Sequence, residues 1–161
     1  MTSTSSLRTG SEKSPTSETP AAARLAPFHL ALPVRDLDAA AQFYCDLLGC
    51  TKGRTAARWI DLNFYGHQLS LHLVEDHDGT AETNPVDGDN VPARHFGVVL
   101  ERSEWDALAA RLKAANTDFI LAPKVRFSGD IGEQATLFLR DPSGNALEFK
   151  SFSNPGQLFA V

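Results

Sequence analysis

The sequence predicts an α+β fold made of two copies of one βαβββ module, because two stretches of the chain repeat. Residues 28–34 and residues 94–100 each read as a strand that leads into a helical pattern. His29 in the first stretch matches His95 in the second, at an offset of 66 residues. The chain therefore carries a histidine at the same place in each copy.

The two copies also end alike, in a strand that follows a glycine turn. Residues 63–70 match residues 141–148 at an offset of 78, which places Glu148 opposite Ser70. The histidine is thus duplicated and the glutamate is not. Two histidines and one glutamate suggest a three-ligand metal site with open coordination positions.

One helix is expected in each copy, from apolar residues at three- and four-residue spacing and from the residues at the ends of the pattern. Asp36 is the expected N-cap of the first helix, and Gly49 ends it. Ser103 is the expected N-cap of the second helix, with Asp106 three residues later in an arrangement close to a capping box.

Three strands are expected after each helix, from their apolar patterns and the turn residues between them. They lie at residues 51–54, 58–63 and 67–74 in the first copy and at residues 119–125, 134–140 and 146–152 in the second.

The expected organisation is one domain preceded by a tail. Residues 1–27 hold eleven Ser or Thr and three Pro without a periodic apolar pattern, which predicts disorder. The domain spans residues 28–161, with module one at 28–74, an acidic loop at 75–92 and module two at 93–161. The loop holds six acids and no Lys or Arg. A structureless loop of this length is typical of a lid or a linker.

Composition excludes several classes of protein. The net charge of −5 argues against a nucleic-acid surface, and no apolar stretch is long enough to span a membrane. Cys45 and Cys50 are the only cysteines. They suggest no disulfide framework, so a reducing compartment fits and we expect a cytoplasmic protein. The alternative is an organellar targeting signal in the Ser-rich tail.

The residue types at the matched positions suit a metal. Each histidine has small or modest neighbours on its own strand face, namely Ala31 and Pro33 for His29, and Gly97 and Val99 for His95. Glu148 shares a strand face with Lys150, and a buried glutamate is costly unless it is paired or metal-bound. Two histidines and one carboxylate suit Fe(II), with Mn(II) or Zn(II) as alternatives. The plainer interpretation of each histidine is a hydrogen-bonded core residue.

Several motifs carry a family resemblance over about residues 27–160. They lie at residues 28–37, 43–44, 48–49, 59–61, 65–68, 95–100, 132–136 and 141–150. Together they resemble the vicinal oxygen chelate superfamily, which includes glyoxalase I, bleomycin-resistance proteins and extradiol ring-cleaving dioxygenases. The stretches at 66–68 and 132–136 resemble the small proteins classed as predicted extradiol-type dioxygenases.

The resemblance implies a curved, cup-like mixed sheet with the helices outside it, and it implies His29, His95 and Glu148 as metal ligands. Glyoxalase I has a fourth ligand where this chain has Ser70, a poor ligand, and this departure favours the three-ligand dioxygenase pattern. We expect the three ligating groups to lie within about 4 Å of one another if one chain closes the cup. If a dimer completes the cup, the ligands come from two chains.

Three further residues are candidates. His72 shares a strand face with Ser70, so it is a metal ligand in a shifted register, an acid/base that deprotonates a catechol, or a structural residue. Arg126 and Lys150 are candidates to hold an anionic group of the substrate, although exposed cations are often only solvated.

The leading functional hypothesis is an Fe(II) extradiol-type dioxygenase that acts on a small catechol-like substrate with O₂. We expect a homodimer without nucleic-acid or membrane partners. The first alternative is a glyoxalase-type metal-dependent lyase or isomerase, in which Glu148 shuttles a proton. The second is a non-catalytic binder of the drug-resistance type, which needs no metal triad.

Overall fold

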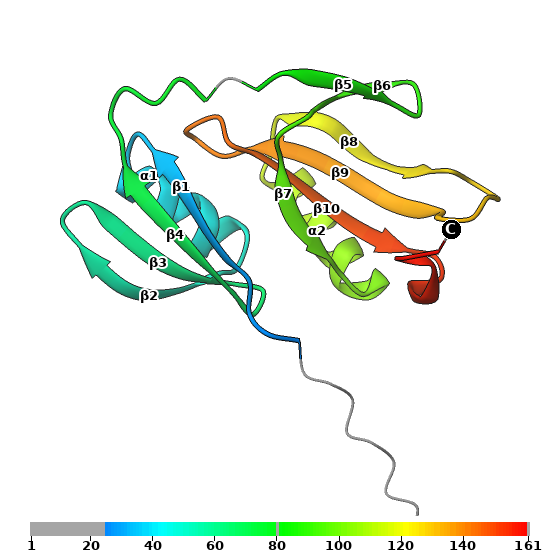
Figure 1. Ribbon diagram of the computed structural model, residues 1–161, viewed down its shortest axis with the longest axis horizontal. Coiled ribbons are helices and arrows are strands. Elements are labelled where there is room, and N and C mark those ends of the chain that lie inside the picture. The colour runs from blue at the N-terminus through cyan, green and yellow to red at the C-terminus, as the bar shows by residue number, and fades with distance from the viewer. Residues whose placement is uncertain (1–24, 80, 161) are drawn as a thin grey trace, which may run out of the picture.

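The two sequence repeats form two four-stranded sheets in the computed structural model, which describes residues 25–79 and 81–160 (Figure 1). The first sheet has the order β1 (His29–Val34), β4 (His67–Leu73), β3 (Trp59–Phe64), β2 (Thr51–Ala56). The second has the order β7 (Phe96–Val99), β10 (Ala146–Phe152), β9 (Gln134–Arg140), β8 (Phe119–Arg126). The predicted α+β fold of two βαβββ modules is confirmed. The prediction of a disordered tail falls on residues 1–27, of which residues 1–24 lie outside the described part.

The same pairing pattern recurs in both sheets. β1 pairs parallel with β4, and β7 pairs parallel with β10, while the other neighbours are antiparallel. β1 and β7 are therefore matched edge strands. Within the described residues, neither of these two strands pairs with a second strand.

The first helical segment begins where the sequence predicts. The carboxylate of Asp36 accepts hydrogen bonds from the backbone N–H groups of Asp38 and Ala39, at 2.8 and 2.9 Å, and so caps α1 (Leu37–Ala41). The chain continues through a wider π-helical segment, η1 (Gln42–Leu47). Gly49 then adopts a φ of +81°, a conformation that suits glycine after a helix.

The second helix, α2 (Arg102–Ala114), corrects one expectation. Its N-cap is Glu101, which makes no side-chain capping bond, and Ser103 lies inside the first turn. Arg102 pairs with Asp106 at 3.0 Å, four residues on, so Arg102 already belongs to the helix. The indole nitrogen of Trp105 donates to the carbonyl of Phe149 at 2.9 Å and ties α2 to β10.

The acidic segment is also more ordered than expected. It contains a hairpin of β5 (Thr83–Val86) and β6 (Asp89–Pro92), so the expectation of a loop without secondary structure is wrong. Asp87 and Gly88 both have positive φ, +48° and +80°, as a tight hairpin turn requires. A short 3₁₀ turn, η2 (Pro155–Gln157), follows β10.

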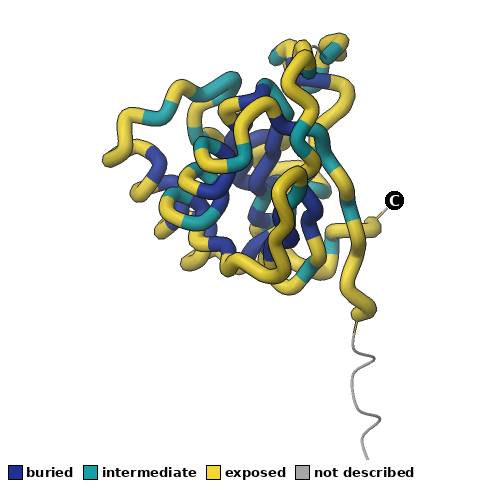
Figure 2. The backbone as a smooth tube through the Cα atoms, turned by 90° about the vertical axis from the view of Figure 1, so that its left-hand side faces the viewer, coloured by how far each residue is buried: buried dark blue, intermediate teal, exposed yellow. Residues whose placement is uncertain are grey.

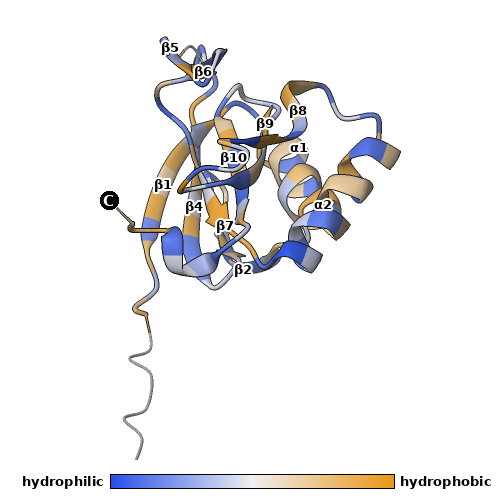
Figure 3. Ribbon diagram, turned by 90° about the vertical axis from the view of Figure 1, so that its right-hand side faces the viewer, coloured by the Kyte–Doolittle hydropathy of each residue, from blue (hydrophilic) through white to orange (hydrophobic). Residues whose placement is uncertain are grey.

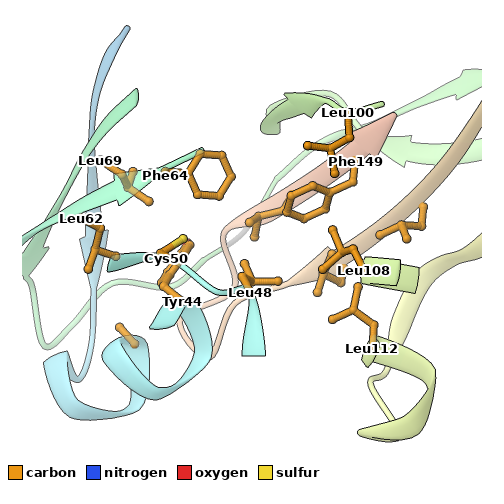
Figure 4. Close-up of a cluster of buried hydrophobic side chains, with 14 of the residues drawn as sticks. Tyr44, Leu48, Cys50, Leu62, Phe64, Leu69, Leu100, Leu108, Leu112 and Phe149 are labelled. Atoms are coloured by element: carbon orange, nitrogen blue, oxygen red, sulfur yellow. The ribbon is translucent and has the colours of Figure 1, made fainter. Parts of the chain in front are cut away.

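One hydrophobic core joins the modules. The helices lie on the same side of the two sheets (Figure 3), and the strand faces beneath them are buried (Figure 2). Side chains from both modules meet there, including Tyr44, Leu48, Phe64, Leu108, Leu112 and Phe149 (Figure 4). The opposite face of each sheet is called here the open face. It carries Asp61 and Ser70 in the first sheet and Thr136 and Glu148 in the second. No helix among residues 25–79 and 81–160 is long and apolar enough to cross a membrane.

The turn before β10 fastens the second module to the first. Asn145 donates to the carbonyl of Pro33 at 2.9 Å, and the hydroxyl of Ser143 accepts from the N–H of Arg35 at 2.9 Å. Tyr44 donates to the buried carboxylate of Asp141 at 3.0 Å. These bonds hold β10, and with it Glu148, in a fixed position relative to the end of β1.

Candidate metal centre

Glu148 is a buried carboxylate on the open face of the second sheet, with 4 % of its surface exposed. The hydroxyl of Thr136 donates to Oε1 at 2.7 Å, and the ammonium of Lys150 lies 3.1 Å from Oε2. Burial tends to raise the pKa of Glu148, but the hydrogen bonds from His95 and Thr136 and the Lys150 charge outweigh burial and hold the pKa below its ordinary value. The carboxylate is therefore ionised and fixed in direction.

His95, just before β7, meets the same carboxylate. Its Nε2 lies 3.1 Å from Oε2 of Glu148, and this contact is the main cause of a raised pKa for His95. Its Nδ1 lies 2.7 Å from the carbonyl oxygen of Pro92. When the imidazole is neutral, an Nδ1–H that donates to Pro92 leaves the lone pair on Nε2, the arrangement found in metal-ligating histidines.

Gly97 sets the spacing between these two residues. A Cβ at this position would overlap the carbonyl oxygen of Glu148, so only glycine allows β7 to pair this closely with β10. Gly97→Ala is expected to destabilise the fold by roughly 1–3 kcal/mol or more, because the strands must move apart. Thermal or chemical unfolding measures this effect. Val99→Ala, an exposed change on the same strand, is the control. Equal stability of the two variants would contradict the close approach.

Two hollows adjoin His95. A groove of about 400 Å³ on the open face is lined by His95, Glu148 and Lys150, with Phe152 and Leu158 at its C-terminal side. A cavity of about 300 Å³ between β1 and β7 touches His95 from another direction. The groove is the better candidate for the site because it reaches both His95 and Glu148. Its volume suits a small molecule.

His29 does not join this pair within one chain. It is exposed at the start of β1, and among the described residues no three His, Cys, Asp or Glu side chains gather closely enough to hold a metal. The expectation that one chain brings His29, His95 and Glu148 together is therefore wrong. The other arrangement stated from the sequence, in which two chains supply the ligands, stays a prediction.

Ser70, the counterpart of Glu148, binds a carboxylate that the sequence reading missed. Its hydroxyl donates to Oδ1 of Asp61 at 2.5 Å, and Arg54 donates to Oδ2 at 2.8 Å. Asp61 is buried on the open face of the first sheet. Its position between the core residues Ile60 and Leu62 was a signal, because a carboxylate within a buried strand needs partners.

Asp61 is expected to stabilise the fold in a pH-dependent way. The hydrogen bond from Ser70, with Arg54, holds the pKa of Asp61 below its ordinary value against the opposing effect of burial. A lowered folded-state pKa contributes stability above the unfolded pKa of about 3.9, and this contribution is lost as the pH falls through the folded value. Asp61→Asn should cost about 1–3 kcal/mol at pH 7 and less near pH 3. A pH-independent difference in unfolding free energy would contradict this.

The other candidates are divided between the two sheets. His72 is exposed on the open face of the first sheet, where it pairs in register with Pro33 and Trp59. Lys150 lies beside Glu148 in the groove. Arg126 is buried at the end of β8 and bonds to Asp89 of the hairpin.

Two βαβββ modules packed about one core, each with an open polar face, define the vicinal oxygen chelate fold. The chain belongs to the Glyoxalase/Bleomycin resistance protein/Dioxygenase superfamily, whose family model matches residues 26–149.

Solved structures agree with this membership. A glyoxalase/bleomycin resistance protein/dioxygenase from Alicyclobacillus acidocaldarius is 37 % identical, with a TM-score of 0.72, over 83 % of this chain and 96 % of that one. Lactoylglutathione lyase from Agrobacterium tumefaciens is 20 % identical, with a TM-score of 0.58, over 87 % and 100 % of the chains. The fosfomycin resistance protein FosX from Listeria monocytogenes is 14 % identical, with a TM-score of 0.60, over 84 % and 98 %. The last two likenesses concern the fold alone.

Proposed function

We propose that the protein is a metal-dependent enzyme of extradiol dioxygenase type, whose metal is held by His95 and Glu148 of one copy and His29 of a second copy. Fe(II) is the favoured metal, with Mn(II) or Zn(II) as alternatives. The observation that carries the proposal is the pair of His95 and Glu148. The carbonyl of Pro92 holds Nδ1 of the imidazole, and the hydroxyl of Thr136 holds Oε1 of the carboxylate. Metal ligands typically have their non-ligating atoms fixed by hydrogen bonds of this kind.

The unpaired edges of β1 and β7 support a second copy as the source of His29. An exposed strand edge presents free N–H and C=O groups and is a natural place for another chain to pair. His29 begins one of these edges, and His95 directly precedes the other. A twofold dimer that brings β1 of one copy to β7 of the other would place His29 of each copy beside His95 and Glu148 of the other. The dimer would then hold two identical metal sites.

The chemistry follows from the ligand set. His29, His95 and Glu148 would hold Fe(II) by two imidazoles and one carboxylate, and the metal would then supply coordination positions for a vicinal diol and for O₂. Lys150 lies on the groove side of Glu148 and would offset negative charge on a bound catechol-like substrate. His72 shares the open face of the first sheet with His29, so the copy that supplies His29 would also supply His72 as the acid/base for a catechol hydroxyl.

Ser70 and Asp61 favour three ligands over four. The carboxylate nearest the position of the missing fourth ligand is that of Asp61, and it already accepts bonds from Ser70, Arg54 and Gln68. A carboxylate with these partners is poorly placed to bind a metal. This observation weakens the glyoxalase-type lyase or isomerase hypothesis.

Purification without oxygen, followed by metal analysis and oxygen uptake against a panel of catechols, tests the proposal. We expect close to one Fe(II) per chain and consumption of O₂ with ring cleavage of at least one catechol. Turnover of a hemithioacetal without O₂ would replace the dioxygenase assignment with the lyase or isomerase. A protein that binds small molecules but takes up no metal would be a non-catalytic binder.

A further inference from the structure

Asp89 of the β5–β6 hairpin neutralises two cations of β8. Its Oδ2 lies 3.0 Å from the ammonium of Lys124 and 3.0 Å from Nη2 of Arg126. One carboxylate thus faces two positive charges, and these contacts connect the hairpin to the second sheet. In Figure 1 the hairpin lies beside the strand that carries both cations.

Arg126 is incompletely satisfied in this cluster. The residue is only 3 % exposed, and its Nε has no hydrogen-bond partner. Gln134, which pairs in register with Arg126, is 6 % exposed and has an unpartnered Oε1. Buried polar groups almost always find partners, and one without a partner is a candidate for binding something else. Asp89 bonds to Nη2 of Arg126 alone, whereas a guanidinium can bind a carboxylate through two of its nitrogens at once.

The cluster shares its surroundings with the candidate metal centre. The guanidinium carbon of Arg126 lies 5.8 Å from the ring centre of Phe138. The imidazole of His95 packs against the same ring, with 5.0 Å between centres. Phe138 is only 1 % exposed and lies between His95 and Arg126, so its buried ring packs against both side chains and links their positions.

We propose that Arg126 and Lys124 form a carboxylate-binding subsite, that Asp89 occupies this subsite in the ligand-free chain, and that the catechol-like substrate of the proposed function bears a carboxylate. A ligand carboxylate set across Nε and Nη2 of Arg126 satisfies the unpaired donor and takes over the role of Asp89. The displaced Asp89 side chain, already 23 % exposed, turns toward solvent. The assignment of the reacting end of the ring rests on the proposed function, whereas the subsite itself does not need a metal.

Benzoate and benzamide test the subsite in chelator-treated protein, because they share a shape and differ in charge. Calorimetric titration of Asp89→Asn should show benzoate bound about tenfold more tightly than by the wild type, since the internal competitor loses its charge. Benzamide affinity should stay the same. Asp87→Asn removes a carboxylate from the same hairpin and is the matched control, with wild-type affinities expected.

Unchanged or weaker benzoate binding by Asp89→Asn would overturn the proposal, as would an equal gain for benzamide. A second variant is needed because the exchange of Asp89 also perturbs the hairpin. Lys124→Met in the Asp89→Asn background should remove most of the gain for benzoate, and a gain that persists in full would also overturn the proposal. Metal content of the wild type is measured separately. A protein that takes up no metal but passes the benzoate test refutes the proposed enzyme and leaves the subsite standing.

Discussion

Glu148→Gln is expected to lower metal affinity by more than about 100-fold and to abolish turnover. Loss of groups that merely support a ligand costs 10- to 100-fold, so loss of a direct ligand should cost more. Glutamine retains an oxygen for the hydroxyl of Thr136 but has no charge to attract a cation. Equilibrium titration of the metal-free protein with Fe(II) without oxygen, or with Mn(II) in air, measures the change.

Glu133→Gln is the matched control for this prediction. Glu133 also accepts two hydrogen bonds in the second module, from Gly129 and Ser153, but it is half-buried and lies outside the groove. Its replacement should leave metal affinity unchanged. If Glu148→Gln binds metal as well as this control does, the metal centre is not where His95 and Glu148 meet.

His72→Ala is expected to slow turnover by roughly 10²–10⁴-fold while metal affinity stays nearly intact, as for the loss of a general acid/base. The side chain is exposed, so the fold should hardly be affected. Steady-state kinetics of oxygen uptake, together with metal titration, separate the two effects.

Other outcomes for His72→Ala have defined meanings. Loss of the metal together with activity would make His72 a fourth ligand, and unchanged turnover would make it structural. His67→Ala is the control, because His67 begins the same strand, β4, and its Nδ1 accepts a hydrogen bond from the backbone N–H of Phe28, just before β1. That variant should retain both metal and turnover.

Regular elements were predictable because local chemistry decides them. Apolar patterns and the turn residues between them predicted the strands at 134–140 and 146–152 with the bounds of β9 and β10, and Asp36 caps its helix as expected. The hairpin was missed because its strands are short and hold few apolar residues. Asp87 and Gly88 were the available signal, since Asp-Gly is a typical hairpin turn.

The candidate site was predictable only where the repeat itself carried the information. The matched strand positions led to His95 and Glu148, and the structure brings these two residues together. The contacts of Pro92 and Asp89 depend on how the hairpin lies against the second sheet, and no local pattern in the sequence encodes that. The separation of His29 from the pair depends on the packing of the modules, which the repeat does not specify.

Mixing two inactive variants tests the central claim most directly. His29→Ala and Glu148→Ala each destroy every site in a homodimer. If the ligands come from two copies, a mixed dimer unites the intact His29 of one chain with the intact Glu148 of the other in one of its two sites. Random re-association should then restore about one quarter of the wild-type metal content and oxygen uptake, since half of the dimers are mixed. No recovery in dimers shown to have exchanged subunits would contradict a metal centre built across two chains.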